Sequence, residues 1–168
     1  MKAVNYPALI DLEASGLHAD SFPIQVAWAM PDGTLAEHLI RPEPDWQAWD
    51  DTAEALHGIT PETLERDGEP AAVVAAALNH SLRGHMVFSD APAYDRFWLD
   101  VLFAAAGRER EFRLGDYWRL IAGTGLGRRP EALAELEARA WREVGAPRHQ
   151  AGNDVRYLRV LFRLASHL

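Results

Sequence analysis

The chain has 168 residues, which fits one globular domain. Hydrophobic residues make up 48% of it and charged residues 25%, so a disordered or collagen-like chain is excluded. No apolar run approaches the ~18 residues of a membrane span, the N-terminus does not resemble a secretory signal, and no cysteine is present to form a disulfide or a thiolate zinc site. We expect a single domain over residues 1–168, in the cytoplasm and without a membrane partner.

Acidic side chains outnumber basic ones, giving a net charge of -8, but the two halves of the chain differ. Residues 1–84 carry 4 basic and 14 acidic side chains, whereas residues 85–168 carry 13 and 11. An acidic surface repels nucleic acid at long range. A nucleic-acid partner would therefore be held by short, local contacts with the help of a metal ion.

Three strands are predicted first. An apolar run predicts a buried strand over residues 8–13, and runs over residues 23–30 and 35–41 flank a Pro-Asp-Gly-Thr turn. The short connections between these strands indicate an antiparallel or mixed meander. The Pro-rich residues 42–58 that follow predict loop and short helical structure.

Helices and short strands alternate over the rest of the chain. Thr60 is a suitable N-cap for a helix with Pro61 at its first position. Apolar periodicity predicts further helices over residues 71–82, 94–106, 118–122, 131–144 and 155–168, and strands over residues 86–89 and 112–114. This order predicts an α/β class, in which a mixed sheet of a three-strand meander followed by alternating strands and helices is flanked by helices.

Carboxylates stand where apolar residues are expected in three of these elements. In the first strand, Asp11 and Glu13 share a face with Leu9, because residues two apart point the same way. A strand end with a solvated polar face is the simpler interpretation of that pair taken alone. Asp95 and Asp154 each head an apolar stripe at helical spacing, where an acid can also merely complement the helix dipole.

Four carboxylates would repel one another if they converged. Two divalent cations would balance their charge, and hard oxygen ligands favour Mg²⁺ or Mn²⁺. Two such ions can stabilise both the attacking and the leaving oxygen of a phosphodiester displacement. The opposite side of the last helix carries three arginines, for which we expect a solvated face, with phosphate binding as the alternative: Arg156, Arg159 and Arg163.

Four short motifs follow one another along the chain. Residues 11–17 read Asp-Leu-Glu-Ala-Ser-Gly-Leu, residues 94–99 read Tyr-Asp-Arg-Phe-Trp-Leu, and residues 149–154 read His-Gln-Ala-Gly-Asn-Asp. Together with His-Gly-Ile-Thr at residues 57–60, they resemble the motifs of the DEDDh 3′–5′ exonucleases, the group that includes proofreading exonucleases and oligoribonuclease. The resemblance runs from residue 8 to the C-terminus and implies a ribonuclease H-like fold.

This resemblance implies roles for five residues. Asp11, Glu13 and Asp154 would hold one metal ion. Asp11 would also bridge to a second ion, and Asp95 would support the site through water. His149 would be the general base that takes a proton from the attacking water, since imidazole exchanges protons near neutral pH.

Two further residues are expected to contact the substrate. Leu17 would be an apolar wedge against the terminal base, and Arg148 would pair with a phosphate. The chain departs from the family pattern at residues 89–90, which are Ser-Asp where the family often carries His-Asn. Asp90 therefore competes with Asp95 for the role of the second-motif carboxylate. We favour Asp95, because it heads a helix.

The sequence thus predicts a Mg²⁺- or Mn²⁺-dependent 3′–5′ exonuclease. It would release 5′-mononucleotides from single-stranded DNA or RNA, or from short oligonucleotides, by two-metal hydrolysis with a histidine base. Relatives are often dimers, so a homodimer is a further expectation. One alternative is a catalytically idle ribonuclease H-like module that binds nucleic acid or acts as a scaffold, and another is a metal-dependent nucleotidase. No residue is seen to read the 2′-hydroxyl, so DNA and RNA are not distinguished.

Overall fold

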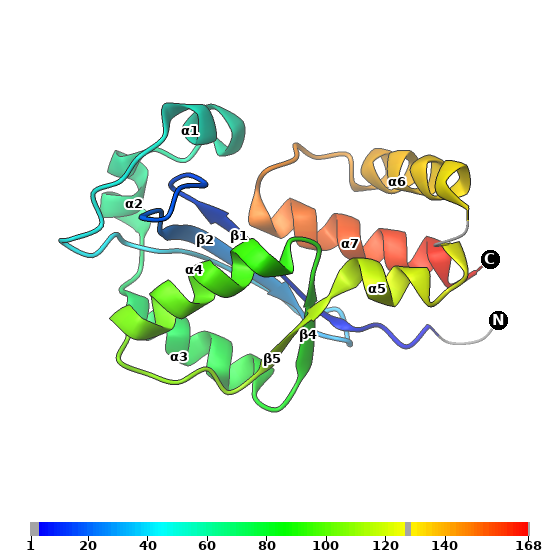
Figure 1. Cartoon of the computed structure of the whole chain (residues 1–168), viewed down its shortest axis with the longest axis horizontal. Helices are drawn as coiled ribbons and strands as arrows, with labels where there is room; N and C mark the ends of the chain where they lie inside the picture. Colours follow the sequence, from blue (N-terminus) through cyan, green and yellow to red (C-terminus); the bar gives the residue numbers. More distant parts are fainter. Residues whose placement is uncertain (1–3, 127–128, 168) are drawn as a thin grey trace.

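Five strands form one mixed sheet in the computed structural model, which describes residues 4–126 and 129–167. They are β1 (Ala8–Ala14), β2 (Pro23–Ala29), β3 (Leu35–Leu39), β4 (Met86–Ser89) and β5 (Arg113–Asp116). Their spatial order is β3-β2-β1-β4-β5 (Figure 1). The first three strands pair antiparallel, whereas β4 runs parallel to β1 and β5 parallel to β4. The predicted meander and the α/β class are confirmed.

Seven helices among the described residues flank this sheet. They are α1 (Asp51–His57), α2 (Pro61–Asp67), α3 (Ala71–Leu82), α4 (Pro92–Ala105), α5 (Tyr117–Ala122), α6 (Pro130–Val144) and α7 (Ala151–Ala165). Helices α3 and α4 cover one face of the sheet, and α5, α6 and α7 cover the other (Figure 1). Helices α1 and α2 lie at one end of the sheet (Figure 1), and Leu64 of α2 packs in a small core with Val101 of α4.

The two faces of β1 enter different cores. Ile10 is fully buried with Ala8 and Leu12 against α3 and α4, whereas Leu9 is fully buried against α5 and α7. This alternation follows from the two-residue period of a strand. The division of β1 predicted from the sequence is confirmed, and it leaves Asp11 on the α7 side of the sheet.

Several elements begin or end a few residues from their predicted bounds. Helix α7 begins at Ala151 instead of residue 155, because the buried Gln25 of β2 accepts a hydrogen bond from the Ala151 N–H at 3.0 Å. Helix α4 begins at Pro92 instead of residue 94, since proline suits the first helical position. Strand β5 continues to Asp116 because it pairs with β4 up to Ser89. Tertiary contacts thus set these bounds.

The arginine face of α7 is only partly solvated. Arg156 is exposed, as expected, but Arg159 is half-buried and donates to the backbone carbonyls of Met30 and Pro31 at 3.0 and 3.2 Å. Arg163 pairs with Glu143. The prediction of a uniformly solvated face is therefore wrong, because the β2–β3 turn and α6 both approach this side of the helix.

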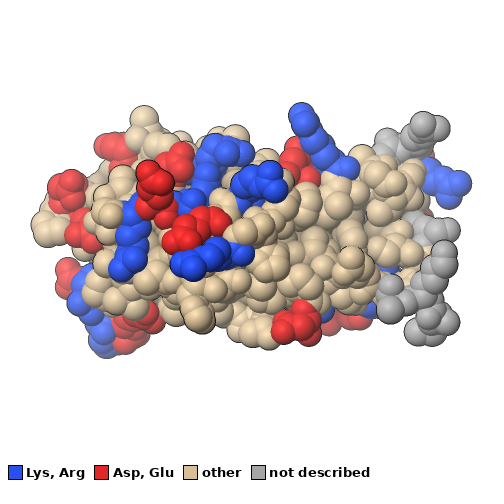
Figure 2. Space-filling view, turned by 90° about the horizontal axis from the view of Figure 1, so that it is seen from below, with Lys and Arg blue, Asp and Glu red and all other residues tan. Residues whose placement is uncertain are grey.

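Charges of both signs are interspersed over the surface seen from below. In Figure 2, Lys and Arg side chains lie next to Asp and Glu side chains, and much of the remaining described surface is uncharged. The described part of this face therefore offers no continuous basic stripe for a long nucleic acid. The helices of the described residues include none with the length and apolar character of a membrane span.

Candidate active site

Five carboxylates gather at one edge of the sheet. Asp11 and Glu13 lie on β1, and Asp90 follows β4 directly. Since β1 and β4 are parallel, their carboxyl ends meet at the same edge. Asp95 in the first turn of α4 and Asp154 in the first turn of α7 arrive there because both helices begin at this edge.

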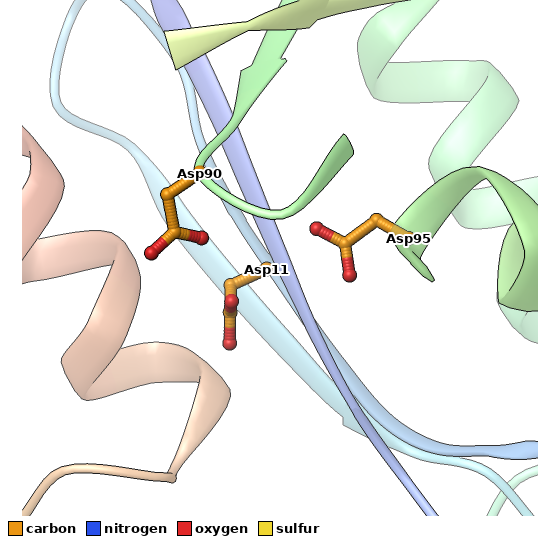
Figure 3. A group of neighbouring side chains, drawn as sticks. All are labelled: Asp11, Asp90 and Asp95. Carbon is orange, nitrogen blue, oxygen red and sulfur yellow. The ribbon is translucent and has the colours of Figure 1, made fainter. Parts of the chain in front are cut away.

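The carboxylates form two groups that share one residue. Ligand oxygens of Asp11, Asp90 and Asp95 all lie within 4.8 Å of one another, and so do those of Asp11, Glu13 and Asp154. Figure 3 shows Asp90 on the loop after β4 and Asp95 on α4, both directed toward Asp11 on β1. Asp11 is thus common to two groups, each of which could hold a metal ion.

Burial and mutual repulsion raise the pKa values of these carboxyl groups. Burial raises the pKa of Asp11 well above its ordinary value, and the charges of Asp95 and Glu13 raise it further. The pKa of Glu13 rises to about 8, first through burial and then through the charge of Asp154. Burial likewise raises the pKa of Asp95 to about 8, although its hydrogen bond from Ser89 opposes the rise. The cluster is costly to ionise on its own.

Asp154 and Asp90 are less strongly perturbed. Burial raises the pKa of Asp154 to about 6, while a hydrogen bond of 2.9 Å from the Gln150 N–H and the neighbouring His149 lower it. Burial also raises the pKa of Asp90. Within the described part of the chain, no lysine or arginine forms an ion pair with any of the five carboxylates. An oxygen-only donor set with this uncompensated charge fits hard divalent cations.

Gln25 fixes the start of α7 above the cluster. Its register partner across the β1–β2 pair is Glu13. The side-chain oxygen of Gln25 accepts from the Ala151 N–H, and its amide donates to Glu37 at 2.6 Å. Because Asp154 lies three residues into the same helical turn, this contact sets its position. Gln25 is not among the residues predicted from the sequence, where its only signal is a polar residue within an apolar strand.

His149 stands in the loop between α6 and α7, directly before the helix that carries Asp154. It is exposed, and its φ of 60° places it in the left-handed region, where few residues other than glycine are found. Backbone strain of this kind is concentrated at functional sites. The loop brings His149 beside the carboxylates, at the point where two clefts meet.

The first of these clefts, the Leu17 cleft, has a volume of about 260 Å³ and reaches the cluster at Glu13. Leu17 is 68% exposed at its rim. Gly16 holds the loop close to its surroundings, since a Cβ there would lie 2.5 Å from the His18 ring. The other walls that bear on its chemistry come from α1, α4 and the α6–α7 loop: Leu56, His57, Trp98 and His149.

The second cleft, the Trp141 cleft, has a volume of about 460 Å³ and reaches the cluster at Asp90 and Asp154. Arg148 lies on its wall, with the guanidinium carbon 4.8 Å from the centre of the Trp141 ring. Arg148 therefore lines the same cleft as Asp90 and Asp154, with its guanidinium over Trp141. Trp141 is not among the residues predicted from the sequence.

The structure therefore brings together all the carboxylates predicted from the sequence and adds one. Asp11, Glu13, Asp95 and Asp154 converge, and His149, Leu17 and Arg148 line the clefts on either side. Asp90, which the sequence offered only as a competitor of Asp95, lies with Asp95 in one group instead of replacing it. The sequence places Asp90 at the end of a strand, but only the parallel pairing of β4 with β1 brings it next to Asp11.

Solved structures of exonuclease I share this fold. A zinc-bound complex of E. coli exonuclease I with single-stranded DNA aligns with 95% of this chain and 39% of its own, with a TM-score of 0.67 and 19% identity. An apo form of exonuclease I aligns with 94% of this chain and 41% of its own, with a TM-score of 0.67 and 18% identity. For a complex of E. coli exonuclease I with a dT13 oligonucleotide, the shares are 74% and 30%, with a TM-score of 0.58 and 19% identity.

No protein-family model and no curated protein sequence matches the chain. At these identities, the likeness to exonuclease I concerns the fold alone, and the predicted ribonuclease H-like fold is confirmed. The chain spans about two fifths of the length of exonuclease I in the zinc-bound and apo structures.

Proposed function

We propose that the chain is a metal-dependent 3′–5′ exonuclease that releases 5′-mononucleotides from single-stranded nucleic acid. The observation that carries the proposal is the pair of carboxylate groups that share Asp11, at the edge of a sheet that exonuclease I also has. Buried carboxylates with no basic partner in the described chain lose their mutual repulsion when cations bind.

The residues fit two hard cations, for which we propose Mg²⁺ or Mn²⁺. Asp11, Glu13 and Asp154 would hold one, and Asp11, Asp90 and Asp95 the other. When bound, such ions polarise the phosphodiester and make the attacking water more acidic. The carboxylates would thereby be ionised at neutral pH, despite their raised pKa values.

His149 acts as the general base. Its exposed imidazole accepts a proton as the water oxygen bonds to phosphorus and the bond from phosphorus to the 3′-oxygen breaks. The leaving oxygen takes up a proton to become the 3′-hydroxyl of the shortened strand, and a 5′-mononucleotide departs. The strained backbone at His149 supports this assignment, because the surrounding loops must hold the residue in place.

The Leu17 cleft would receive the terminal nucleoside. Leu17 offers an apolar side chain at its rim, and the largely buried rings of Trp98 and His57 form part of its lining. Trp98 is held in place by a hydrogen bond of 3.0 Å to Ser21. Such rings bind any base, since every base has a π face.

The test uses 5′-labelled DNA and RNA single strands from 2 to 30 nucleotides, with Mg²⁺, Mn²⁺ or EDTA. The wild-type chain is compared with His149→Ala, Asp154→Asn and a control variant, Asp100→Asn, on the exposed side of α4. We expect a ladder that shortens from the 3′ end with metal only, is lost in the first two variants and is kept in the control.

Other outcomes would identify the alternatives. Metal-dependent binding without any cleavage would favour the idle module. Hydrolysis of mononucleotides without shortening of oligonucleotides would favour the nucleotidase. The length and sugar of the fastest substrate would define its class.

A further inference from the structure

The carboxylate cluster lies between two clefts that meet at His149. Glu13 lines the Leu17 cleft, whereas Asp90 and Asp154 line the Trp141 cleft. A phosphodiester bound at the cluster joins two nucleosides. If one nucleoside occupies the Leu17 cleft, the strand continues past the cluster on the side of the Trp141 cleft.

The Trp141 cleft has rigid aromatic walls. The rings of Trp141 and Tyr157 stack with centres 4.3 Å apart and planes inclined by 8°. Tyr157 is buried and donates a hydrogen bond of 3.1 Å to Glu137, which fixes the stack between α6 and α7. From α5, the Trp118 indole donates to the backbone carbonyl of Asp90 at 3.0 Å, which ties that wall directly to the cluster.

The charges in this cleft select the part of a nucleotide that fits it. Glu137, Asp90 and Asp154 all face it, and they oppose a free phosphate deep inside. Among the described residues that line it, Arg148 is the one arginine, and its guanidinium covers Trp141. Bases stack on tryptophan rings and on guanidinium planes alike. The lining therefore suits an uncharged aromatic group near the cluster.

We infer that the Trp141 cleft is a second nucleoside site, which binds the base immediately upstream of the scissile phosphate. The inference rests on the proposed exonuclease function and extends it. The base stacks on the Arg148 guanidinium that covers Trp141, while the phosphate that joins it to the terminal nucleotide lies at the carboxylates. Cleavage then depends on the base of the penultimate nucleotide as well as on the terminal one.

The test combines a change in the enzyme with a change in the substrate. Wild-type chain and Trp141→Leu are assayed on an oligonucleotide, on the same strand with an abasic penultimate nucleotide, and on one with an abasic terminal nucleotide. Phe97→Leu, an aromatic substitution on the exposed side of α4, is the matched control. Trp141→Phe keeps an aromatic ring, and thermal unfolding of each variant establishes that it folds.

For the wild type, we expect removal of the penultimate base to lower kcat/KM about tenfold, the size of a lost base stack. Trp141→Leu should lower kcat/KM for the intact strand about as much and make it insensitive to that base. Trp141→Phe should restore most of the sensitivity. Loss of the terminal base should slow all variants equally, and Phe97→Leu should behave as the wild type.

Two results would overturn the inference and differ in what they leave standing. If the enzymes cleave but the reductions in kcat/KM caused by Trp141→Leu and by removal of the penultimate base simply multiply, the cleft is no base site. The exonuclease function then stands. If the folded wild-type chain cleaves no strand with any metal, the proposed function fails and takes this inference with it.

Discussion

The two faces of β1 show how one strand serves two purposes. On the α3 and α4 side, Ile10 and its neighbours are buried among apolar groups throughout. On the α7 side, the strand starts with the fully buried Leu9 and then presents Asp11 and Glu13. Burial stabilises the fold on the first face, whereas on the second it raises the pKa of each carboxyl group.

The difference indicates that the acidic face is kept at a cost in stability. Cation binding would remove that cost, because coordination would replace the repulsion between the carboxylates. Substitutions on the two faces should therefore change the stability of the metal-free protein in opposite directions, even when the substituted residues are neighbours on the strand.

The largest expected effects come from the neighbours Asp11 and Ile10. Asp11→Asn removes a ligand of both carboxylate groups, so cleavage should fall about a thousandfold or more, as loss of several kcal/mol of transition-state stabilisation implies. The same change should raise the Tm of the metal-free protein at pH 8. Ile10→Ala should lower the free energy of unfolding by about 2–5 kcal/mol and leave kcat within about twofold.

Activity assays and urea unfolding measure both effects. If Asp11→Asn destabilised the metal-free chain as Ile10→Ala does, the acidic face would be an ordinary part of the core and the comparison would fail.

A smaller effect is expected from Asp90, the carboxylate added to the family pattern. Asp90→Asn should lower cleavage about tenfold at limiting Mn²⁺, because one of the two groups loses a charged oxygen. Excess Mn²⁺ should restore most of the rate. A metal titration of the rate measures this, with Asp100→Asn as the control. Equal losses at all metal concentrations would instead assign Asp90 to substrate contacts.

The stability of the metal-free protein should fall as the pH rises from 5 to 8. Glu13 and Asp95 keep their protons in the folded state up to about pH 8, and Asp154 up to about pH 6, whereas an unfolded chain releases them near pH 4. The folded state thus binds more protons in this window, so raising the pH favours unfolding. Tm should drop by several degrees, since a change of 1 kcal/mol shifts it by about 2–4 °C at this size.

Thermal unfolding with and without Mg²⁺ tests that slope. The cation should raise Tm more at pH 8 than at pH 5, and Glu13→Gln should flatten the pH dependence of the metal-free chain. A Tm that rises from pH 5 to pH 8 without metal would contradict the raised pKa values.

The smallest effect is expected from Gln25, which connects the acidic face to α7. Gln25→Leu leaves the Ala151 N–H without its acceptor, so the free energy of unfolding should fall by about 1–3 kcal/mol. Cleavage should fall a few-fold, because Asp154 loses its fixed position. Reduced stability with unchanged kcat would mean that α7 keeps its place without this contact.

The sequence alone determined which residues share a face within each element. Spacing of two along β1 and of three and four along α4 and α7 fixed the sides on which Asp11, Asp95 and Asp154 stand. The order of the elements was enough to predict the mixed sheet and its helical layers, as the structure confirms. These features depend on local backbone geometry, which neighbouring residues dictate.

Distances between elements were decided only by the tertiary structure. Asp90 joined the cluster because β4 pairs with β1, and α7 began early because Gln25 reaches it across the sheet. The Trp141 cleft needed side chains of three separate helices to meet. Such meetings depend on packing and register between elements, and no spacing along the chain encodes them.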